Sequence, residues 1–576
     1  MFPRWSQFMF IPLGVALSLS QTVNAQSDPK DQTFAALRSI QKKLGPDAIL
    51  SGGVRSLLNL ASRWDTFKAE FTPAGSVSKT GGAGRLPTGE ISAPPDFGPP
   101  SLTSRLRSFT ANESTTAWCG KNVVVGYNDT ESLPKSFAAS GGAMSILGYS
   151  VSHNKGVSFI DMGYPTLSSD PSSFLGLDQV MICSGTQNFY FSSLYFTATR
   201  AGVSVSASVD GGRTFGQPVV VASASLSGHI FDGDWMAVNP ANPNQLFVSY
   251  TDDDVTFTVC PTALGTSIEL VNSNDGGNTW SSPQTVAGEV CLDSSSATPG
   301  AVEFSGIGVD PLGAGVYVTW ENLVPKSLAR GINISSAAIP ATPSPTPFGL
   351  SFSNAVKISS VNYAGTLDIP ESGATFAVSA LFQGLQGRIY TVEHPELTIG
   401  KGPKNTGVLY VTWNDGANAV ADTFSINGTY QFTDVLLTSS TDGGHSWSKP
   451  VRVNSDVEDG VTHPFTDQFH PTVATDNTGA IAVCFYDRRN DPLNFLIGRY
   501  CATSTDGKTW SNFAIDPKGG PSIVNQDDSG ASDWLGDYET LATDSLNNSG
   551  GFVGGYTNTS AGYQNIRENK FSSEEE

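Results

Sequence analysis

The stretch that decides the fold reads Ser208-Val-Asp-Gly-Gly-Arg-Thr-Phe215, and nearly the same eight residues return along the chain. The further copies are SNDGGNTW (273–280), STDGGHSW (440–447), the one-residue-shorter STDGKTW (504–510) and SHNKGVSF (152–159). The last copy keeps the spacing and replaces the aspartate by Asn154. Internal repetition at a spacing of tens of residues is typical of repeat architectures, so the octapeptide predicts a fold built from copies of one unit.

Each residue of the octapeptide has a local role in a tight turn. Asp210 can accept hydrogen bonds from backbone N–H groups of its own turn, and Gly212 permits a positive φ. The final aromatic residue, Phe215 or Trp280, can fill a gap between strands. The equivalent aspartates of the other copies are Asp275, Asp442 and Asp506. Because one active site does not need five copies of a nucleophile, we interpret the octapeptide as a structural joint.

A larger unit surrounds each octapeptide. It begins with a short strand that opens on an acid and an aromatic residue, as in DGDWMAV at 232–238. A second strand ends in an aromatic residue followed by polar residues, as in LFVSYTD at 246–252. A third strand leads into the octapeptide and a fourth leaves it. Four strands per repeat is one blade of a β-propeller.

Six such units begin near residues 113, 178, 232, 303, 393 and 467, and a partial unit covers about 533–568. The fourth unit has a Pro-rich insertion, ATPSPTPFG, in place of the octapeptide. The last unit can close the ring by borrowing a strand from the N-terminal side of the domain, which would remove open sheet edges. The sequence therefore predicts an all-β propeller over residues 109–568, with seven four-stranded blades or alternatively six.

Composition agrees with many short strands joined by turns. The 576 residues include 60 Gly and 34 Pro, and only 15% are charged. The formal net charge is −21, which argues against nucleic acid or an anionic membrane as a partner because both require a basic face.

The N-terminus reads MFPRWSQFMFIPLGVALSLSQTVNAQS. A positive first segment, an apolar stretch and small residues before Gln26 predict a signal peptide over residues 1–25. We therefore expect a secreted protein, either periplasmic or extracellular, and no other stretch is apolar enough to span a membrane. Residues 26–72 show helical spacing of apolar residues and predict a short helical segment. A Gly/Pro/Ser-rich linker is expected over 73–108.

The six cysteines are plausible disulfides in an exported protein. Fifteen connectivities are open, and their positions in the repeats favour three pairs: Cys119–Cys183, Cys260–Cys291 and Cys484–Cys501. Free buried thiols are the alternative. No cysteine or histidine spacing indicates zinc.

The pattern S-x-D-x-G-x-T-W resembles the Asp-box, or bacterial neuraminidase repeat. On these motifs, residues 110–565 are similar to the sialidase-like propeller superfamily, whose Asp-boxes lie away from the catalytic face. Sialidases of this superfamily hold the substrate carboxylate with three arginines, use a Tyr paired with a Glu as nucleophile, and use an Asp as acid/base. Their early Arg-Ile-Pro motif is absent here.

If the octapeptides mark one rim, the loops after the second strands and before the first strands mark the other. These loops carry many polar residues, most of them acidic, among them Asn128 and Asp129 after the first of these second strands. The expected catalytic residues are Asp234, Asp487, Asp537, Tyr538 and Glu539, and the expected substrate-binding residues are Arg488, Arg489, Trp235, Trp320 and Trp413. The alternative is that the acids serve only as turn residues. Tyr538 and Glu539 are neighbours on a strand, so they should point to opposite faces.

The resemblance and the acidic rim together predict a secreted, sialidase-like glycoside hydrolase that acts on extracellular glycans at the central mouth. The alternative is a non-catalytic propeller that binds a glycan or a protein at the cell surface. No cofactor is required. Structural calcium is possible at Asp232, Asp234 or Asp252–Asp254, although no EF-hand pattern supports it. The oligomeric state stays open.

Overall fold

The computed structural model describes part of the chain. The described residues are 29–44, 51–70, 85–94, 110–139, 143–261, 263–292, 300–323, 330–340, 346–367, 383–385, 389–391, 394–422, 428–458, 460, 463–521, 535–547 and 550–572. The predicted signal peptide at 1–25 lies outside them, as does most of the predicted linker.

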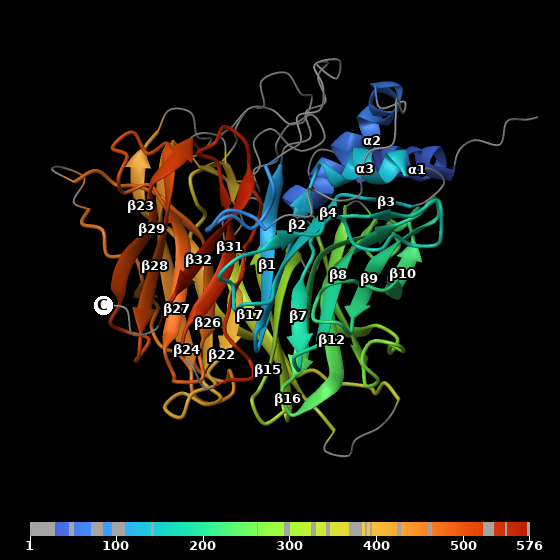
Figure 1. The fold of residues 1–576 in the computed structure, drawn as a ribbon. Coiled ribbons are helices and arrows are strands. Elements are labelled where there is room, and N and C mark those ends of the chain that lie inside the picture. The colour runs from blue at the N-terminus through green and yellow to red at the C-terminus, as the bar shows by residue number, and fades with distance from the viewer. Residues whose placement is uncertain are drawn as a thin grey trace, which may run out of the picture.

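Within these residues the strands form a seven-bladed propeller of antiparallel sheets (Figure 1), which confirms the larger of the two predicted blade numbers. The first blade comprises β1 (Ala111–Cys119), β2 (Asn122–Asp129), β4 (Leu147–Ser152) and β5 (Ile160–Asp161). The second comprises β7 (Met181–Ser184), β8 (Asn188–Phe196), β9 (Arg200–Ser208) and β10 (Val219–Ser225). The third comprises β11 (His229–Asn239), β12 (Asn242–Asp254), β13 (Gly265–Ser273) and β14 (Gln284–Cys291). Two short strands, β3 (Met144–Ser145) and β6 (Phe174–Leu175), extend the second blade.

The other four blades follow the same order. The fourth blade comprises β15 (Ala301–Val309), β16 (Gly315–Leu323), β17 (Arg330–Ala338) and β18 (Val356–Val361), and the fifth comprises β22 (Glu396–Ile399), β23 (Leu409–Ala421), β24 (Thr429–Ser440) and β25 (Val451–Arg452). The sixth comprises β26 (Gln468–Thr475), β27 (Ile481–Asp487), β28 (Leu496–Ser504) and β29 (Ser511–Pro521). The seventh comprises β30 (Leu541–Ala542), β31 (Phe552–Asn558) and β32 (Asn565–Phe571). A small separate sheet comprises β19 (Thr366–Leu367), β20 (Gln383–Leu385) and β21 (Ile389–Thr391).

The first strand of each blade is the innermost. The strands β1, β7, β11, β15, β22, β26 and β30 contact one another in this order, and β30 contacts β1 again. A closed ring of this kind places the ends of all first strands around one axis, so loops from distant parts of the chain meet at its mouth.

The last blade is completed by a segment from the N-terminal side. Ile91 and Ser92 donate backbone hydrogen bonds to the carbonyl of Ile566 on β32, at 2.9 and 3.2 Å. At the other end of the same segment, Leu86 donates to Phe159 beside β5 of the first blade. Residues 85–94, which composition places in the linker, therefore join the outer edges of the first and last blades, as the borrowed-strand prediction required.

The octapeptides connect the third and fourth strands, which confirms their interpretation as joints. In the second blade the Asp210 carboxylate accepts hydrogen bonds from the Thr214 hydroxyl at 2.6 Å and from its backbone N–H at 3.0 Å. Gly212 has φ +84°, and a Cβ there would lie 2.2 Å from a methyl group of Val124 in the first blade. The joint therefore also sets the spacing between neighbouring blades.

All three predicted disulfides are present. Cys119–Cys183 links the innermost strands of the first two blades, Cys484–Cys501 links neighbouring strands of the sixth, and Cys260–Cys291 lies in the third. Because they join elements that the blades already hold together, they restrict the unfolded chain more than they shape the native one.

The predicted helical segment forms α1 (Pro29–Leu44) and α2 (Gly52–Glu70), which lie with α3 (Ser132–Ala138) at one end of the strands (Figure 1). Phe34 stacks on Trp64 with ring centroids 4.1 Å apart and meets Phe174 of the second blade edge to face at 5.8 Å. The helices share one buried cluster with the second and third blades. The sequence left open whether this segment packs on the propeller or acts as a spacer, and it packs. No described helix is long and apolar enough to cross a membrane.

Candidate functional site

Four of the predicted site residues meet near the axis of the propeller. Trp235 of β11 and Tyr538 of the last blade pack edge to face with ring centroids 4.9 Å apart, and His394 contacts both rings. Asp234 and Asp537 are buried beside them. The ring of first strands thus brings together residues about 300 positions apart, as the propeller prediction implied.

Other carboxyl groups surround this axial cluster. Glu113, Asp178 and Asp232 are all at most 1% exposed. Burial is the main cause that raises the pKa of Glu113, Asp178 and Asp234 well above the ordinary range, and neighbouring carboxylates raise it further. Neither oxygen of Asp234 has a hydrogen-bond partner; the nearby Ser192 hydroxyl lowers the pKa only in part.

Glu539 does not join the axial cluster, because it lies on the opposite face of the chain from Tyr538, as predicted. Its carboxylate accepts a hydrogen bond from the Tyr486 hydroxyl and pairs with Arg499 at 2.9 Å. Burial raises the pKa of Glu539, and Arg499 lowers it. A cavity of about 10 Å³, lined by Tyr486, Arg499 and Tyr556, adjoins this cluster and has room for about one water molecule.

The two adjacent arginines predicted to hold substrate are both paired with carboxylates of the protein. Arg488 lies 3.1 Å from Asp467, and both side chains are fully buried. Arg489 lies 2.6 Å from Asp487, the predicted catalytic acid, and stacks over Tyr500. A guanidinium already engaged in this way is poorly placed to clamp the carboxylate of a sugar.

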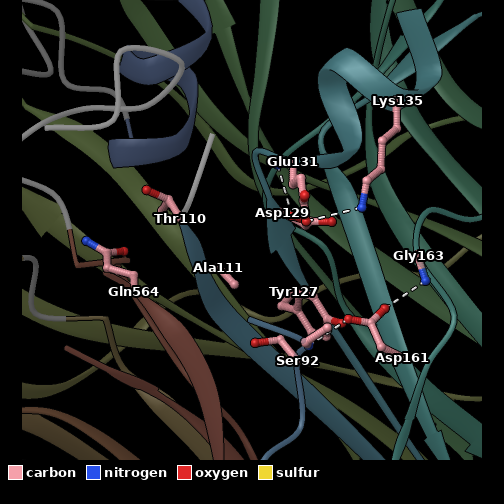
Figure 2. Close-up of a pocket in the computed structure, with 11 residues that line it drawn as sticks. Ser92, Thr110, Ala111, Tyr127, Asp129, Glu131, Lys135, Asp161, Gly163 and Gln564 are labelled. Carbon is pink, nitrogen blue, oxygen red and sulfur yellow. Dashed lines mark hydrogen bonds and ion pairs between the residues drawn. The ribbon is translucent and has the colours of Figure 1, made fainter. Parts of the chain in front are cut away.

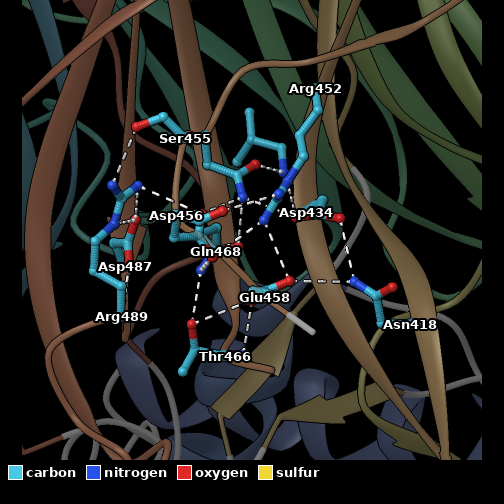
Figure 3. Close-up of polar contacts among 12 residues, drawn as sticks. Asn418, Asp434, Arg452, Ser455, Asp456, Glu458, Thr466, Gln468, Asp487 and Arg489 are labelled. Atoms are coloured by element: carbon cyan, nitrogen blue, oxygen red, sulfur yellow. Dashed lines mark hydrogen bonds and ion pairs between the residues drawn. The ribbon is translucent and has the colours of Figure 1, made fainter. Parts of the chain in front are cut away.

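Arg489 belongs to a wider polar network between the fifth and sixth blades (Figure 3). Asp456 lies between Arg489 and Arg452, at 3.6 and 3.1 Å from their guanidinium nitrogens. Glu458 lies 3.2 Å from Arg452 and accepts a hydrogen bond from the Thr466 backbone. Burial and the neighbouring Asp456 raise the pKa of Glu458 to about 8. Because its groups are paired with one another, this network holds the two blades together.

The remaining predicted aromatic platforms lie inside the blades. Trp320 is 3% exposed in the core that contains the fourth blade, and Trp413 is fully buried in the fifth. The indole N–H of Trp413 donates to Asp415 at 3.2 Å. The structure does not bring these two rings to the axial cluster.

A different group of acids surrounds a cavity of about 20 Å³ between the first blade and the closing segment (Figure 2). It lies at the rim where second strands end. Its lining residues are Ser92, Ala93, Thr110, Ala111, Tyr127, Asp129, Glu131, Lys135, Asp161, Gly163 and Gln564. Unlike the axial cluster, this cavity has partly exposed acidic side chains on its wall.

Asp129 is the last residue of β2 and is held by the start of α3. Its oxygens accept hydrogen bonds from the Glu131 backbone at 3.0 Å and the Ser132 hydroxyl at 2.6 Å. Burial raises the pKa of Asp129 to about 7, and the charges of Glu131 and Asp161 contribute in the same direction. Lys135, ion-paired with Glu131 at 3.1 Å, opposes this increase. Asp129 therefore exchanges its proton near neutral pH.

Asp161, at the end of β5, has a different environment. It accepts backbone hydrogen bonds from Gly163 at 2.8 Å and from Ala93 of the closing segment at 2.7 Å. Tyr127 lies between the two acids in Figure 2, and burial raises its pKa well above the ordinary value, with Asp161 adding to the effect.

The cavity thus places Asp129, whose pKa of about 7 suits proton donation, near a second carboxyl group that accepts two backbone hydrogen bonds, and a pair of carboxyl groups can act as acid and base. Asp129 was named only among the polar residues that follow second strands and not among the expected catalytic residues, and Asp161, Glu131 and Lys135 were missed. Asp161 follows the SHNKGVSF copy directly in the sequence, so the only signal was its position on a fourth strand. Its approach to Asp129 depends on how β4 and β5 pair.

The structure gives no support for a metal centre in the part of the chain that it describes, where no group of three or more His, Cys, Asp or Glu side chains is arranged to hold an ion. Of the acids that sequence analysis put forward for calcium, Asp252 pairs with His229 at 2.9 Å. Structural calcium stays a prediction.

No known family model matches the chain, and no curated protein matches it. Among solved structures it is similar to a Hadza microbial sialidase, at 13% identity over 74% of this chain and 73% of that one, with a TM-score of 0.40. It is also similar to an alpha-L-arabinanase of Penicillium chrysogenum, at 9% identity over 70% of this chain and 94% of that one, with a TM-score of 0.41. A third similar structure is an ulvan lyase, a polysaccharide lyase, at 8% identity over 85% of this chain and 96% of that one, with a TM-score of 0.42. At this low sequence identity and TM-score, the matches carry no conclusion about the function of this chain.

Proposed function

We propose that this protein hydrolyses glycosidic bonds in glycans, with Asp129 and Asp161 as its pair of carboxyl groups. Glycoside hydrolysis needs one carboxyl group that is protonated before the reaction and one that is charged. The observation that carries the proposal is that Asp129 and Asp161 line one cavity, in which burial raises the pKa of Asp129 to about 7.

In this mechanism the Asp129 carboxyl donates its proton to the glycosidic oxygen as the bond to the sugar carbon breaks. Asp161 accepts a proton from the water that attacks this carbon, and the cavity has room for such a water. The net reaction consumes one water and returns both carboxyl groups to their starting states once the proton passes back to Asp129. Lys135 keeps Glu131 paired, so that Glu131 does not compete for the proton.

We also propose that the protein works outside the cell, which the N-terminal sequence and three disulfides favour. A narrower version of this proposal is that the enzyme is an exo-sialidase, which releases terminal sialic acids. It requires arginines that are available to a sugar carboxylate, whereas Arg488 and Arg489 are paired with Asp467 and Asp487. We therefore expect neutral glycosides to be better substrates than sialosides.

A panel of fluorogenic glycosides, including a sialoside, tests the proposal. Asp129→Asn should lower turnover of glycosides with poor leaving groups at least about a hundredfold, since general acid catalysis is typically worth that much. It should leave activated aryl glycosides, which need no protonation, nearly unaffected. Asp65→Asn is a matched control, because the Asp65 side chain is 80% exposed.

Asp161→Asn should lower turnover of both classes of glycoside, because the attacking water is needed in either case. Asp161 also holds Ala93 of the closing segment, so the melting temperature of each variant must be measured alongside its rate. Full turnover in both folded variants would exclude this pair of residues. No turnover on any glycoside or glycan would contradict the proposed function and favour a binding role.

A further inference from the structure

The first turn of α2 rests directly on the carboxyl groups of the axial cluster. The backbone N–H of Ser51 donates a 2.6 Å hydrogen bond to Asp232, and its hydroxyl lies 3.4 Å from an oxygen of Asp178. The same hydroxyl caps the helix by accepting the Val54 N–H at 3.0 Å. Asp178 and Asp232 are at most 1% exposed, so the start of α2 covers two carboxyl groups beside the axial cluster.

The contact at the start of α2 tolerates no side chain at one position. A Cβ on Gly53 would lie 2.7 Å from a carboxyl oxygen of Asp178 and 3.2 Å from the Cβ of Leu177. The N-terminus of a helix carries partial positive charge, which favours its placement against carboxyl groups. Shape and charge therefore both fit this helix end to the axial acids.

The helices can leave the propeller without breaking its sheets. Among the described residues, no backbone–backbone hydrogen bond joins α1 or α2 to a blade. The attachment consists of apolar packing, such as Phe34 against Phe174, and of side-chain contacts, such as the Thr33 hydroxyl with the Ser172 carbonyl at 2.7 Å. Displacing the helices therefore breaks side-chain packing and side-chain hydrogen bonds but no backbone ladder.

The axial cluster retains unsatisfied hydrogen-bonding capacity beneath this helix. Asp234, Asp253 and Glu303 are at most 1% exposed; Asp253 and Glu303 face each other, and neither oxygen of Asp234 has a hydrogen-bond partner among the described residues. Aromatic surface from Trp235 and Tyr538 lies next to Asp234. Acceptor oxygens beside aromatic rings suit a ligand that carries several hydroxyl donors and disfavour an anionic one.

We propose that α1–α2 is an intramolecular cover that keeps the axial cluster closed, and that its displacement exposes a binding site for a neutral, hydroxyl-rich ligand. In the closed state Ser51 supplies donors that ligand hydroxyls replace in the open state. This site is separate from the Asp129–Asp161 cavity and does not depend on hydrolysis there.

Two single variants of the full chain open the cover. Gly53→Ala places a Cβ against Asp178, and Ser51→Glu places a carboxylate against Asp178 and Asp232. We expect amides of residues 51–60 to exchange hydrogen about tenfold faster in both, because opening becomes more frequent. Asn59→Ala, later in the same helix, is the control and should exchange at the rate of the parent protein. Circular dichroism checks that the blades stay folded.

Native gels that contain neutral galactomannan or anionic polygalacturonate then measure binding. The two opening variants should be retarded at least about threefold more than the parent by galactomannan and not by polygalacturonate. Faster exchange without added retardation would show that the helices cover no such site. Unchanged exchange in both variants would show that they do not act as a cover. Asp129→Asn should bind galactomannan as the parent protein does. The binding result therefore does not depend on whether the proposed hydrolysis is observed.

Discussion

The backbone N–H of Ile91 donates a 2.9 Å hydrogen bond to the carbonyl of Ile566, which joins a residue near the start of the described chain to its last strand. Ile91 is fully buried in the cluster shared by the first and last blades. One short segment therefore covers the open edge that a seven-bladed ring would otherwise leave.

Ile91→Ala should lower the free energy of unfolding by about 2–5 kcal/mol, because it leaves a cavity at the seam where the ring closes. Chemical denaturation followed by tryptophan fluorescence measures this change. Leu312→Ala is the control, since Leu312 is 79% exposed and its truncation should cost less than about 0.5 kcal/mol. Equal stabilities of the two variants would show that the segment contributes nothing to closure.

Removal of the disulfide between the first two blades should also destabilise the fold. Replacing both Cys119 and Cys183 by Ser should cost about 2–4 kcal/mol, mainly because the unfolded chain loses a cross-link that closes a loop of 64 residues. The melting temperature under non-reducing conditions is the readout. A parent protein treated with reductant should shift in the same direction, and an unchanged melting temperature would contradict the cross-link.

The octapeptide joints should affect stability but not activity. Asp275→Ala removes the acceptor of hydrogen bonds from the Thr279 hydroxyl at 2.6 Å and its backbone at 2.9 Å. We expect a loss of about 1 kcal/mol, since the exposed donors can turn to water. Turnover per folded molecule should stay at the level of the parent protein. A selective loss of turnover would place the active site at this rim.

Stability should fall as pH rises from about 5 to 8. Several acids have pKa values of about 7 or 8 in the folded state and near 4 when unfolded, because burial disfavours their charge: Asp129, Glu269, Glu568 and Glu458. The folded state then holds more protons than the unfolded state over this range, so deprotonation favours unfolding.

The opposite slope is expected in acid. Hydrogen bonds lower the pKa of Asp442 and Asp506 to about 2, so their stabilisation is lost as pH falls below about 4. Melting temperatures measured from pH 2 to 9 should therefore pass through a maximum near pH 4 to 5. Glu458→Gln should flatten the slope on the alkaline side, and a maximum at pH 8 or above would contradict the assignment.

The pH dependence of the proposed hydrolysis follows from the pKa of Asp129, which is about 7. For glycosides with poor leaving groups, kcat/KM should fall about tenfold per pH unit above this value, as the general acid loses its proton. Asp129→Asn should abolish this decline, leaving a low and flat profile. A parent profile that stays flat from pH 6 to 9 would exclude Asp129 as the acid.

Sequence reasoning was most successful where the signal is local and repeated. The Ser–x–Asp–Gly pattern specifies its own turn, because Asp210 accepts hydrogen bonds from residues only four positions away. Since such turns recur at the spacing of a blade, the number and order of strands could be predicted from them. The same regularity placed Asp234 and Tyr538 at one mouth.

The functional details were less predictable because they depend on which side chains face one another across blades. Tyr538 is next to Glu539 in the sequence, yet Glu539 pairs with Tyr486 from another blade. Arg488 and Arg489 are adjacent and engage different carboxylates. A strand alternates its faces, so residues that are neighbours in sequence become members of different clusters.

By itself, the sequence determined the class of fold and the location of the joints, and it favoured the disulfide pairs that the structure shows. Each of these depends on short-range turn chemistry or on the position of a residue within a repeat. Only the tertiary structure decided that α2 rests on Asp232, that residues 85–94 close the ring and that Asp161 lies beside the Asp129 cavity. These are contacts between distant segments, and their energies come from burial and charge in surroundings that no single stretch of chain contains.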